Sequence, residues 1–214
     1  MGRAITWTMS PPVGSEWPLT AVSSEPTDVI AGLAQLNDAD LAAAAREGRA
    51  GAFDLIVERH RRHVYQLCYR FVANHEDASD LSQDVFLRAY RGLRTFRGQS
   101  ALATWLYRIS VNVCLNRVAV KTPITEPIEE RRHVDTQAEP APERLLREER
   151  AVRVRAGIAR LPPKQRAALV LRLYHELSHQ EIADVLGSSV GAVKANVFHA
   201  LQSLKRILGE DGSS

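Results

Sequence analysis

The segment from Leu177 to Leu204 constrains the fold of this 214-residue chain more than any other stretch. It reads LSHQEIADVLGSSVGAVKANVFHALQSL. Ser178 followed by Glu181 predicts a capping box, in which the hydroxyl and the carboxylate each accept a hydrogen bond from an early backbone N–H. Gly187 can end that helix with a positive φ, and either of the two serines after it can cap the next helix. We therefore predict two helices joined by a tight turn.

The second helix of this pair has an apolar side and a polar side. The apolar side carries Val193, Val197, Ala200 and Leu204 at helical spacing. The polar, basic or stackable residues on its other sides are Lys194, Asn196, Phe198 and His199. A helix of this kind, set at an angle by a short turn, fits the major groove of DNA. We predict a DNA-binding helix-turn-helix over residues 179–198; the alternative is a helical hairpin that only packs.

Helical periodicity continues through most of the chain, and no long segment alternates with the period of a β-strand. The expected fold class is all-α, with two small helical domains joined by a flexible linker. The linker is assigned to the charged, Pro-rich stretch 120–142, which buries too little apolar surface to offset the entropy of ordering. The other expected bounds are 1–36 for a disordered N-terminal tail, 37–119 for the first domain, 143–208 for the second and 209–214 for a disordered C-terminal tail. Helices are expected over about 38–48, 51–74, 77–94, 101–118, 143–160 and 165–174, followed by two short helices.

Residues 75–87, HEDASDLSQDVFL, hold four acidic residues and no Lys or Arg. On a helix, Asp77, Asp80 and Asp84 share the side opposite to the apolar stripe. A charge run of this kind is usually only a solvated face. Because these carboxylates surround an exposed leucine, Leu87, we favour a docking face for a partner protein with a basic, helical surface.

Residues 88–117 hold six arginines and no acidic residue. From Thr95 to Arg117 the aromatic residues are Phe96, Trp105 and Tyr107. Each aromatic could equally pack in a core, but stacking side chains interleaved with positive charge are typical of single-stranded nucleic acid binding. Asn112 shares one helical edge with Thr104 and Arg108, and an amide beside aromatic rings can hold an extruded base.

Composition narrows the classes of function. A pI near 9.1 with a net charge of only +3 is a weak indication of a nucleic acid partner. Cys68 and Cys114 lack metal-ligand spacing and are expected to be buried in a reducing compartment, with a thiol switch as the less favoured alternative. No stretch approaches the roughly 18 apolar residues of a membrane span, and no signal-peptide pattern opens the chain. We expect a cytoplasmic protein with no catalytic residues, metal or cofactor.

Two stretches resemble a known family. DASDLSQDVFLRAYRGLRTFRGQSALATWLYRISVN, residues 77–112, resembles region 2 of the extracytoplasmic-function, or group IV, sigma factors of bacterial RNA polymerase. LPPKQRAALVLRLYHELSHQEIADVLGSSVGAVKANVFHAL, residues 161–201, resembles region 4 of the same family. The resemblance implies a promoter-specificity subunit that is not an enzyme. It also implies three partners: the polymerase core, promoter DNA and an anti-sigma factor.

The resemblance also implies the roles of particular residues. The clamp helices of the largest polymerase subunit would be bound by Asp77, Asp80, Gln83, Asp84, Phe86 and Leu87. The minus-ten element would be read and melted by Phe96, Arg97, Ser100, Thr104, Trp105, Arg108 and Asn112, the last contacting a flipped base. The minus-thirty-five element would be contacted by Lys194, Asn196, Phe198 and His199.

The recognition helix departs from the family pattern. Many relatives read G-T-V-[KR]-S-R, whereas residues 191–196 read GAVKAN, and His199 and Leu201 stand where arginines are common. We therefore predict weaker or altered minus-thirty-five recognition.

Two other classes of function are less consistent with the sequence. A stand-alone helix-turn-helix regulator would leave the acidic and aromatic segments without a role. An enzyme acting on nucleic acid would need a carboxylate cluster, metal ligands or a nucleophile–base pair, whereas the acids line one helix face and the seven histidines are scattered.

Overall fold

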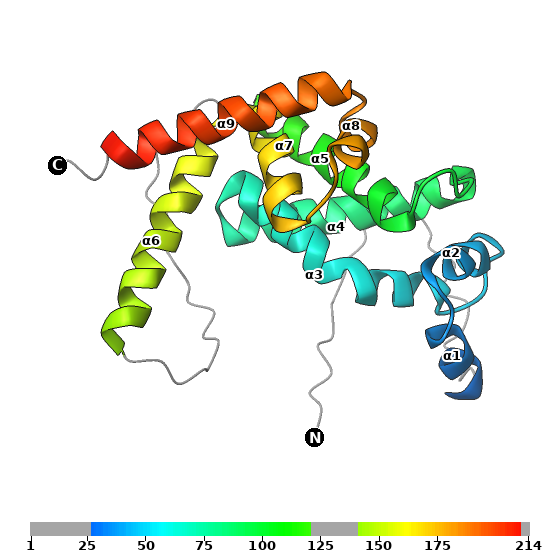
Figure 1. Ribbon diagram of the computed structural model, residues 1–214. Helices are drawn as coiled ribbons and strands as arrows, with labels where there is room; N and C mark the ends of the chain where they lie inside the picture. The colour runs from blue at the N-terminus through cyan, green and yellow to red at the C-terminus, as the bar shows by residue number, and fades with distance from the viewer. Residues whose placement is uncertain (1–26, 121–140, 211–214) are drawn as a thin grey trace.

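The computed structural model describes residues 27–120 and 141–210, and all regular elements in these two ranges are helices (Figure 1). The N-terminal domain contains α1 (Thr27–Ala34), α2 (Asp38–Arg46), α3 (Ala52–Val72), α4 (His75–Gly92), a 3-10 turn (Leu93–Thr95) and α5 (Leu102–Val120). The C-terminal domain contains α6 (Ala141–Ala159), α7 (Pro163–Tyr174), α8 (His179–Leu186) and α9 (Val190–Glu210). The all-α prediction is confirmed. Most of the expected linker, residues 121–140, lies outside the described residues.

The helices of the N-terminal domain form where caps and apolar stripes coincide. The side chains of Asn37 and Asn74 accept hydrogen bonds from Asp40 N and Asp77 N, which satisfies an early N–H of α2 and of α4. The stripe predicted for α4 is buried and comprises Ala78, Leu81, Val85 and Ala89. It faces α3 and α5, so the opposite side of α4 is left for other contacts.

A helix lies within the segment that the sequence analysis assigned to an N-terminal tail. Residues 27–34 form α1, although 1–36 were expected to be a tail; residues 1–26 lie outside the described range. Leu33 is fully buried beside the core of α2 and α3, and Arg59 donates to the carbonyl of Ala34 at 2.7 Å. Buried Leu33 and a cation at the helix end therefore anchor α1.

The C-terminal domain is built around α7. Pro163 occupies the first turn of this helix, and residues 166–171 are all buried. The last helix, α9, is 21 residues long rather than short, because its apolar stripe continues along α7 and α6. Gly157 permits the close approach of α6 and α9, since a Cβ there would meet Leu204 Cδ1 at 2.7 Å.

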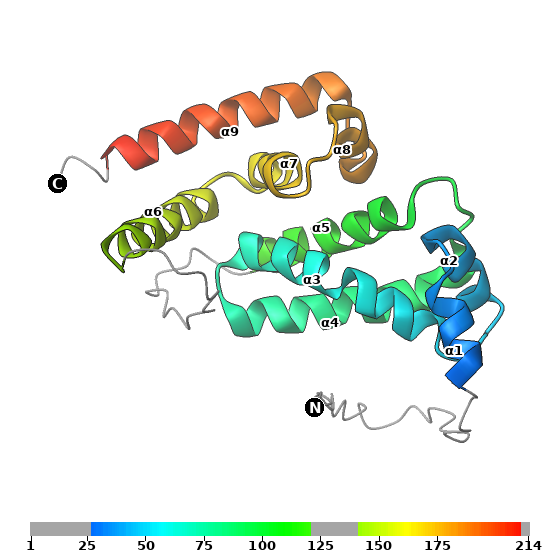
Figure 2. The same ribbon diagram turned by 60° about the horizontal axis from the view of Figure 1, so that its bottom comes forward.

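The two domains pack against each other, which the sequence did not predict. Figure 2 shows the layers, with α9 outermost, then α6 to α8, then α3 and α5, and α4 on the far side. One cluster of buried side chains contains both Phe71 of α3 and Leu169 of α7. The two bundles therefore share a core in this structure.

Candidate protein and nucleic-acid interfaces

The helix-turn-helix forms as its local signals predict. Ser178 Oγ accepts from Glu181 N at 3.2 Å, and Glu181 Oε2 accepts from Ser178 N at 2.8 Å. Hydrogen bonds from the side chain and the backbone of Ser178 lower the pKa of the Glu181 carboxyl group. Gly187 ends α8 with φ +58°, and Ser189 Oγ accepts from Ala192 N at 3.2 Å. Ser189 is thus the residue that caps α9.

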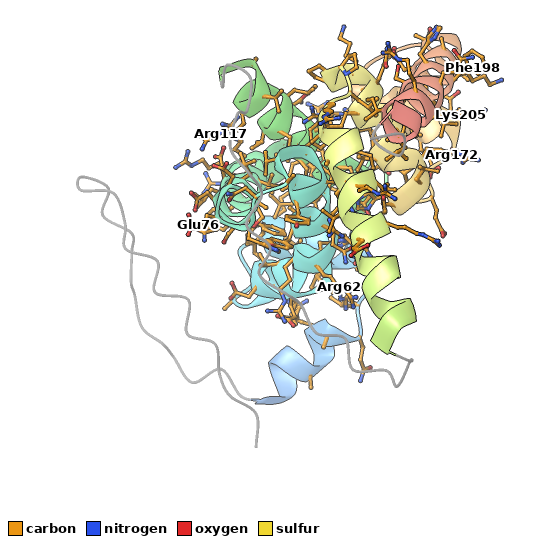
Figure 3. All side chains as sticks on the ribbon, turned by 90° about the vertical axis from the view of Figure 1, so that its left-hand side faces the viewer. Arg62, Glu76, Arg117, Arg172, Phe198 and Lys205 are labelled. Carbon is orange, nitrogen blue, oxygen red and sulfur yellow. The ribbon has the colours of Figure 1, made fainter. Side chains whose placement is uncertain are left out.

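The outer side of α9 carries the residues predicted to contact duplex DNA. Lys194, Phe198 and His199 are exposed, while Asn196 is half-buried. Phe198 is 57% exposed, with its ring 5.6 Å from that of His199. Figure 3 shows Phe198 and Lys205 on the side of the molecule opposite to Glu76 and Arg117. Leu201, 46% exposed, adds a second apolar side chain to the exposed part of this helix.

The acidic face of α4, defined as Asp77, Asp80, Gln83, Asp84, Phe86 and Leu87, is not uniformly available. Asp80 is exposed, and Asp84 forms an exposed pair with Arg88 at 3.0 Å, which raises the pKa of Arg88. Asp77 is less accessible, because its carboxylate pairs with Arg117 of α5 at 2.6 Å and its side chain is only 18% exposed. Gln83, Phe86 and Leu87 are half-buried.

The aromatic face is defined as Phe96, Arg97, Ser100, Thr104, Trp105, Arg108 and Asn112. The rings of Phe96 and Trp105 lie 5.0 Å apart, and both residues are half-buried. Trp105 also packs on Gly92, where an added Cβ would meet its ring at 3.2 Å. The backbone of the loop is held by Arg46, which donates to the Phe96 carbonyl at 3.3 Å. The two rings therefore both support the fold and border solvent.

The polar edge of α5 differs along its length. Thr104 is buried, whereas Arg97, Arg108 and Asn112 are exposed and Ser100 is half-buried. Arg108 donates to the carbonyl of Asp184 in α8 at 2.8 Å. The structure thus brings part of the aromatic face into contact with the C-terminal domain.

The sequence did not reveal two polar residues at the domain boundary. Arg166 is 5% exposed and donates to Phe71 O at 2.6 Å, and burial lowers its pKa. His175 Nδ1 lies 3.2 Å from the hydroxyl of Tyr107, whose pKa burial raises. The sequence held one signal for the burial of Arg166, which comes directly before the apolar run AALVL.

Cys68 and Cys114 are buried, as predicted, and lie close enough for their thiols to interact. The hydrogen bond that the Cys114 thiol shares with Cys68, and then burial, raise the pKa of the Cys114 thiol. A buried, protonated thiol is a poor nucleophile, so these contacts favour packing over redox sensing. Within residues 27–120 and 141–210, no group of His, Cys, Asp and Glu side chains is arranged to hold a metal ion.

Comparisons with known proteins agree with the division of the chain into two domains. Residues 56–122 match the family model of sigma-70 region 2, and residues 151–204 match that of sigma-70 region 4. The RNA polymerase sigma-H factor of Pseudomonas aeruginosa is 34% identical over 185 residues, covering 82% of this chain and 96% of its own. The sigma factor SigM of Mycobacterium tuberculosis is 37% identical over 174 residues, covering 81% of this chain and 85% of its own.

Solved structures show the same fold. CnrH, in complex with the cytosolic domain of CnrY, superposes with a TM-score of 0.62 at 28% identity, covering 83% of this chain and 99% of its own. The sigma factor RpoE of Bartonella quintana, in complex with the anti-sigma factor NepR, shares the fold at a TM-score of 0.55 and 18% identity, covering 75% of this chain and 98% of its own.

The chain therefore belongs to the extracytoplasmic-function sigma factors of the sigma-70 family. As a member of this family it binds RNA polymerase and promoter DNA and directs promoter-specific transcription initiation. None of the helices in the described ranges is both long and apolar enough to cross a bilayer.

Proposed function

We propose that the two faces of the N-terminal domain divide the work of initiation, and that the acidic face of α4 docks on the clamp helices of the largest polymerase subunit. Exposed Asp80 and partly exposed Asp84 supply the negative charge that a basic helical surface would meet. Phe86 and Leu87 add apolar contact beside them. Asp77 contributes by holding α5 against α4 through Arg117.

The aromatic face is assigned to the minus-ten element. Exposed Arg97 and Arg108 suit the phosphate backbone, and Asn112, also exposed, suits the edge of an extruded base. Trp105 and Phe96 offer a ring surface for stacking. The observation that carries this assignment is that exposed arginines, two rings in contact and an exposed amide lie on α5 and on the loop before it.

The outer side of α9 is assigned to the minus-thirty-five element, through Lys194, Asn196, Phe198 and His199. Lys194 is an exposed cation on the recognition helix, and Asn196 and His199 carry side-chain groups able to hydrogen bond. Because so little positive charge faces outward here, this contact contributes less affinity than is common in the family.

Control by an anti-sigma factor is inferred from the same fold, since NepR is bound to a sigma factor of this architecture. We assign the protein to the cytoplasm, where RNA polymerase acts. We also infer that it has no catalytic activity of its own. A stress signal that releases the inhibitor would then switch on transcription.

Run-off transcription with purified core polymerase tests the proposed function. Promoter-specific transcripts should form only when the protein is added, and should disappear when the acidic face is reversed in charge. Transcription that does not depend on the protein would contradict the proposal. A stand-alone regulator would instead bind duplex promoter DNA without polymerase.

A further inference from the structure

The loop of residues 96–101, here called the minus-ten loop, is built on the first helices of the chain. The N-terminal domain has two groups of buried side chains, and the first lies between α3, α4, α5 and the C-terminal domain. The second group joins α1 and α2 to α3 and to both ends of the loop; its buried members include Leu33, Leu41, Ile56, Leu93 and Leu102. Phe96 and Trp105 pack against this second group. Figure 2 shows α2 at the end of the domain where α4 gives way to α5.

Arg46, in the last turn of α2, makes a direct contact with the minus-ten loop. Its Nη1 donates a hydrogen bond to the carbonyl of Phe96 at 3.3 Å. The N–H of Phe96 donates in turn to the carbonyl of Leu93 at 3.1 Å, which closes the 3-10 turn. The backbone of Phe96 is thus held both by its own turn and by a helix that lies earlier in the chain. Because the Arg46 donor is charged, this hydrogen bond is stronger than a neutral one of the same length.

The contact at Phe96 bears on the position of two aromatic rings. The ring of Phe96 lies 5.0 Å from that of Trp105, and Trp105 also packs on Gly92. A rotation of the Phe96 backbone would therefore change the surface that the two rings present together. A binding site needs its groups to be held within about 0.5 Å of the productive geometry. Arg46 can thus affect recognition of a base although it lies outside the aromatic face.

We propose that Arg46 is a positioning residue for recognition of the minus-ten element. Through the Phe96 carbonyl it fixes the minus-ten loop, so that the rings of Phe96 and Trp105 are in place before DNA binds. This inference rests on the proposed minus-ten role of the aromatic face, and it adds α2 to the elements on which that role depends. Arg46 is exposed, so a direct contact with a DNA phosphate is the competing role that the experiments must separate.

Three variants of the full chain make this separation. Arg46→Met removes the donor and keeps the apolar stem of the side chain, whereas Arg46→Lys restores a cationic donor. Arg49→Met is the matched control for loss of charge, because Arg49 is also exposed and follows Arg46 by three residues. Both arginines lie at the surface, so all three variants should stay helical by circular dichroism.

The fluorescence of Trp105 reports the state of the loop in the free protein. Trp7 and Trp17 are replaced by phenylalanine, which leaves Trp105 as the single tryptophan of the chain. Arg46→Met should increase quenching of Trp105 by acrylamide about twofold, because the loop opens locally once its anchor is lost. Arg46→Lys and Arg49→Met should stay close to the wild type. Unchanged quenching in folded Arg46→Met would overturn the proposal.

Reconstituted holoenzyme tests the consequence for DNA. Permanganate reactivity measures the opening of a promoter fragment selected for binding to the wild-type holoenzyme, with each of the four bases in turn at the extruded position. Arg46→Met should lower opening about fivefold, the change that one hydrogen bond typically produces, and should reduce the preference among the four bases. Its salt dependence of binding should match the wild type. A salt slope lower by about one, with the base preference intact, would show a phosphate contact and contradict positioning.

The wild-type holoenzyme keeps this inference separate from the proposed function. A preference among the four bases that Arg46→Met leaves unchanged would contradict the positioning role alone. The absence of any such preference in the wild type would instead contradict the assignment of the aromatic face to the minus-ten element.

Discussion

The acidic face of α4 and the aromatic face of α5 lie in the same domain but differ in accessibility. On α4, Asp80 is exposed and Asp84 faces solvent in a pair with Arg88. On α5, Arg108 is tied to the C-terminal domain through the Asp184 carbonyl. The surface proposed to face polymerase is thus available in this structure, while the surface proposed to face DNA is partly covered.

The largest effect is expected from reversing charge on the acidic face. Asp84→Arg should weaken core binding about 100-fold, because like charges at a docking surface cost several kcal/mol. Its pairing with Arg88 is exposed and contributes little to folding, so the variant should keep its melting temperature. Asp54→Arg, an exposed acid on α3, is the matched control. A fluorescence titration measures the affinity of both variants for core polymerase. Equal loss of affinity in the two variants would refute specific docking through the acidic face of α4.

Acidification is expected to weaken the packing between the two domains. Burial, and then His63 and Arg70, lower the pKa of His175 from 6.5 to about 4. The packed domains favour neutral His175, so the stability of their contact is complete above pH 6.5 and decreases as the pH falls towards 4. In that window the equilibrium should shift towards separated domains by up to about tenfold per pH unit. Energy transfer between fluorophores on exposed Asp54→Cys and Lys205→Cys should fall accordingly, and the His175→Gln variant should flatten this response.

On the recognition helix, Asn196→Arg should raise promoter affinity by up to about tenfold and steepen its salt dependence by about one phosphate contact. The reason is that Asn196 stands half-buried beside exposed Lys194, where an arginine could reach the backbone. Filter binding of holoenzyme across a salt series measures both quantities. Unchanged affinity and slope would show that this position does not face DNA.

The smallest effect concerns the fold of the DNA-binding motif. Ser178→Ala removes one half of the capping box and should destabilise the protein by about 1 kcal/mol. Ser188→Ala is the matched control, because Ser189 rather than Ser188 caps α9. Thermal unfolding measures both variants. Equal melting temperatures for Ser178→Ala and the wild type would contradict the role of the cap.

Contacts between residues close in the sequence could be predicted from the sequence, whereas contacts between distant residues could not. Ser178 and Glu181 are three residues apart, so their capping box is visible in the sequence itself. The ion pair between Asp77 and Arg117 spans 40 residues, and Asp77 was therefore predicted to face a partner with no sign of Arg117. The roles proposed for Asp80, Asp84 and Asn112 stay predictions.

The helical periodicity of the sequence did not predict the contact between the two domains. Arg166 and Phe71 are 95 residues apart, and nothing near Phe71 marks its carbonyl as an acceptor. The N-terminal helix α1 was missed for a related reason, since Leu33 becomes informative only once its place in the core is known. Capping residues and apolar stripes were enough to predict most of the helices. The packing of the helices against one another depended on individual contacts between residues far apart in the sequence.

The division of labour between the two faces is tested most directly by Asn112→Ala in reconstituted holoenzyme. Permanganate reactivity of unpaired thymines in the minus-ten region measures opening, and a core titration runs alongside. Loss of the contact to an extruded base should lower opening by about tenfold to a hundredfold while core affinity stays unchanged. If core binding and opening fall together, or if opening is unaffected, the assignment of the two faces is wrong.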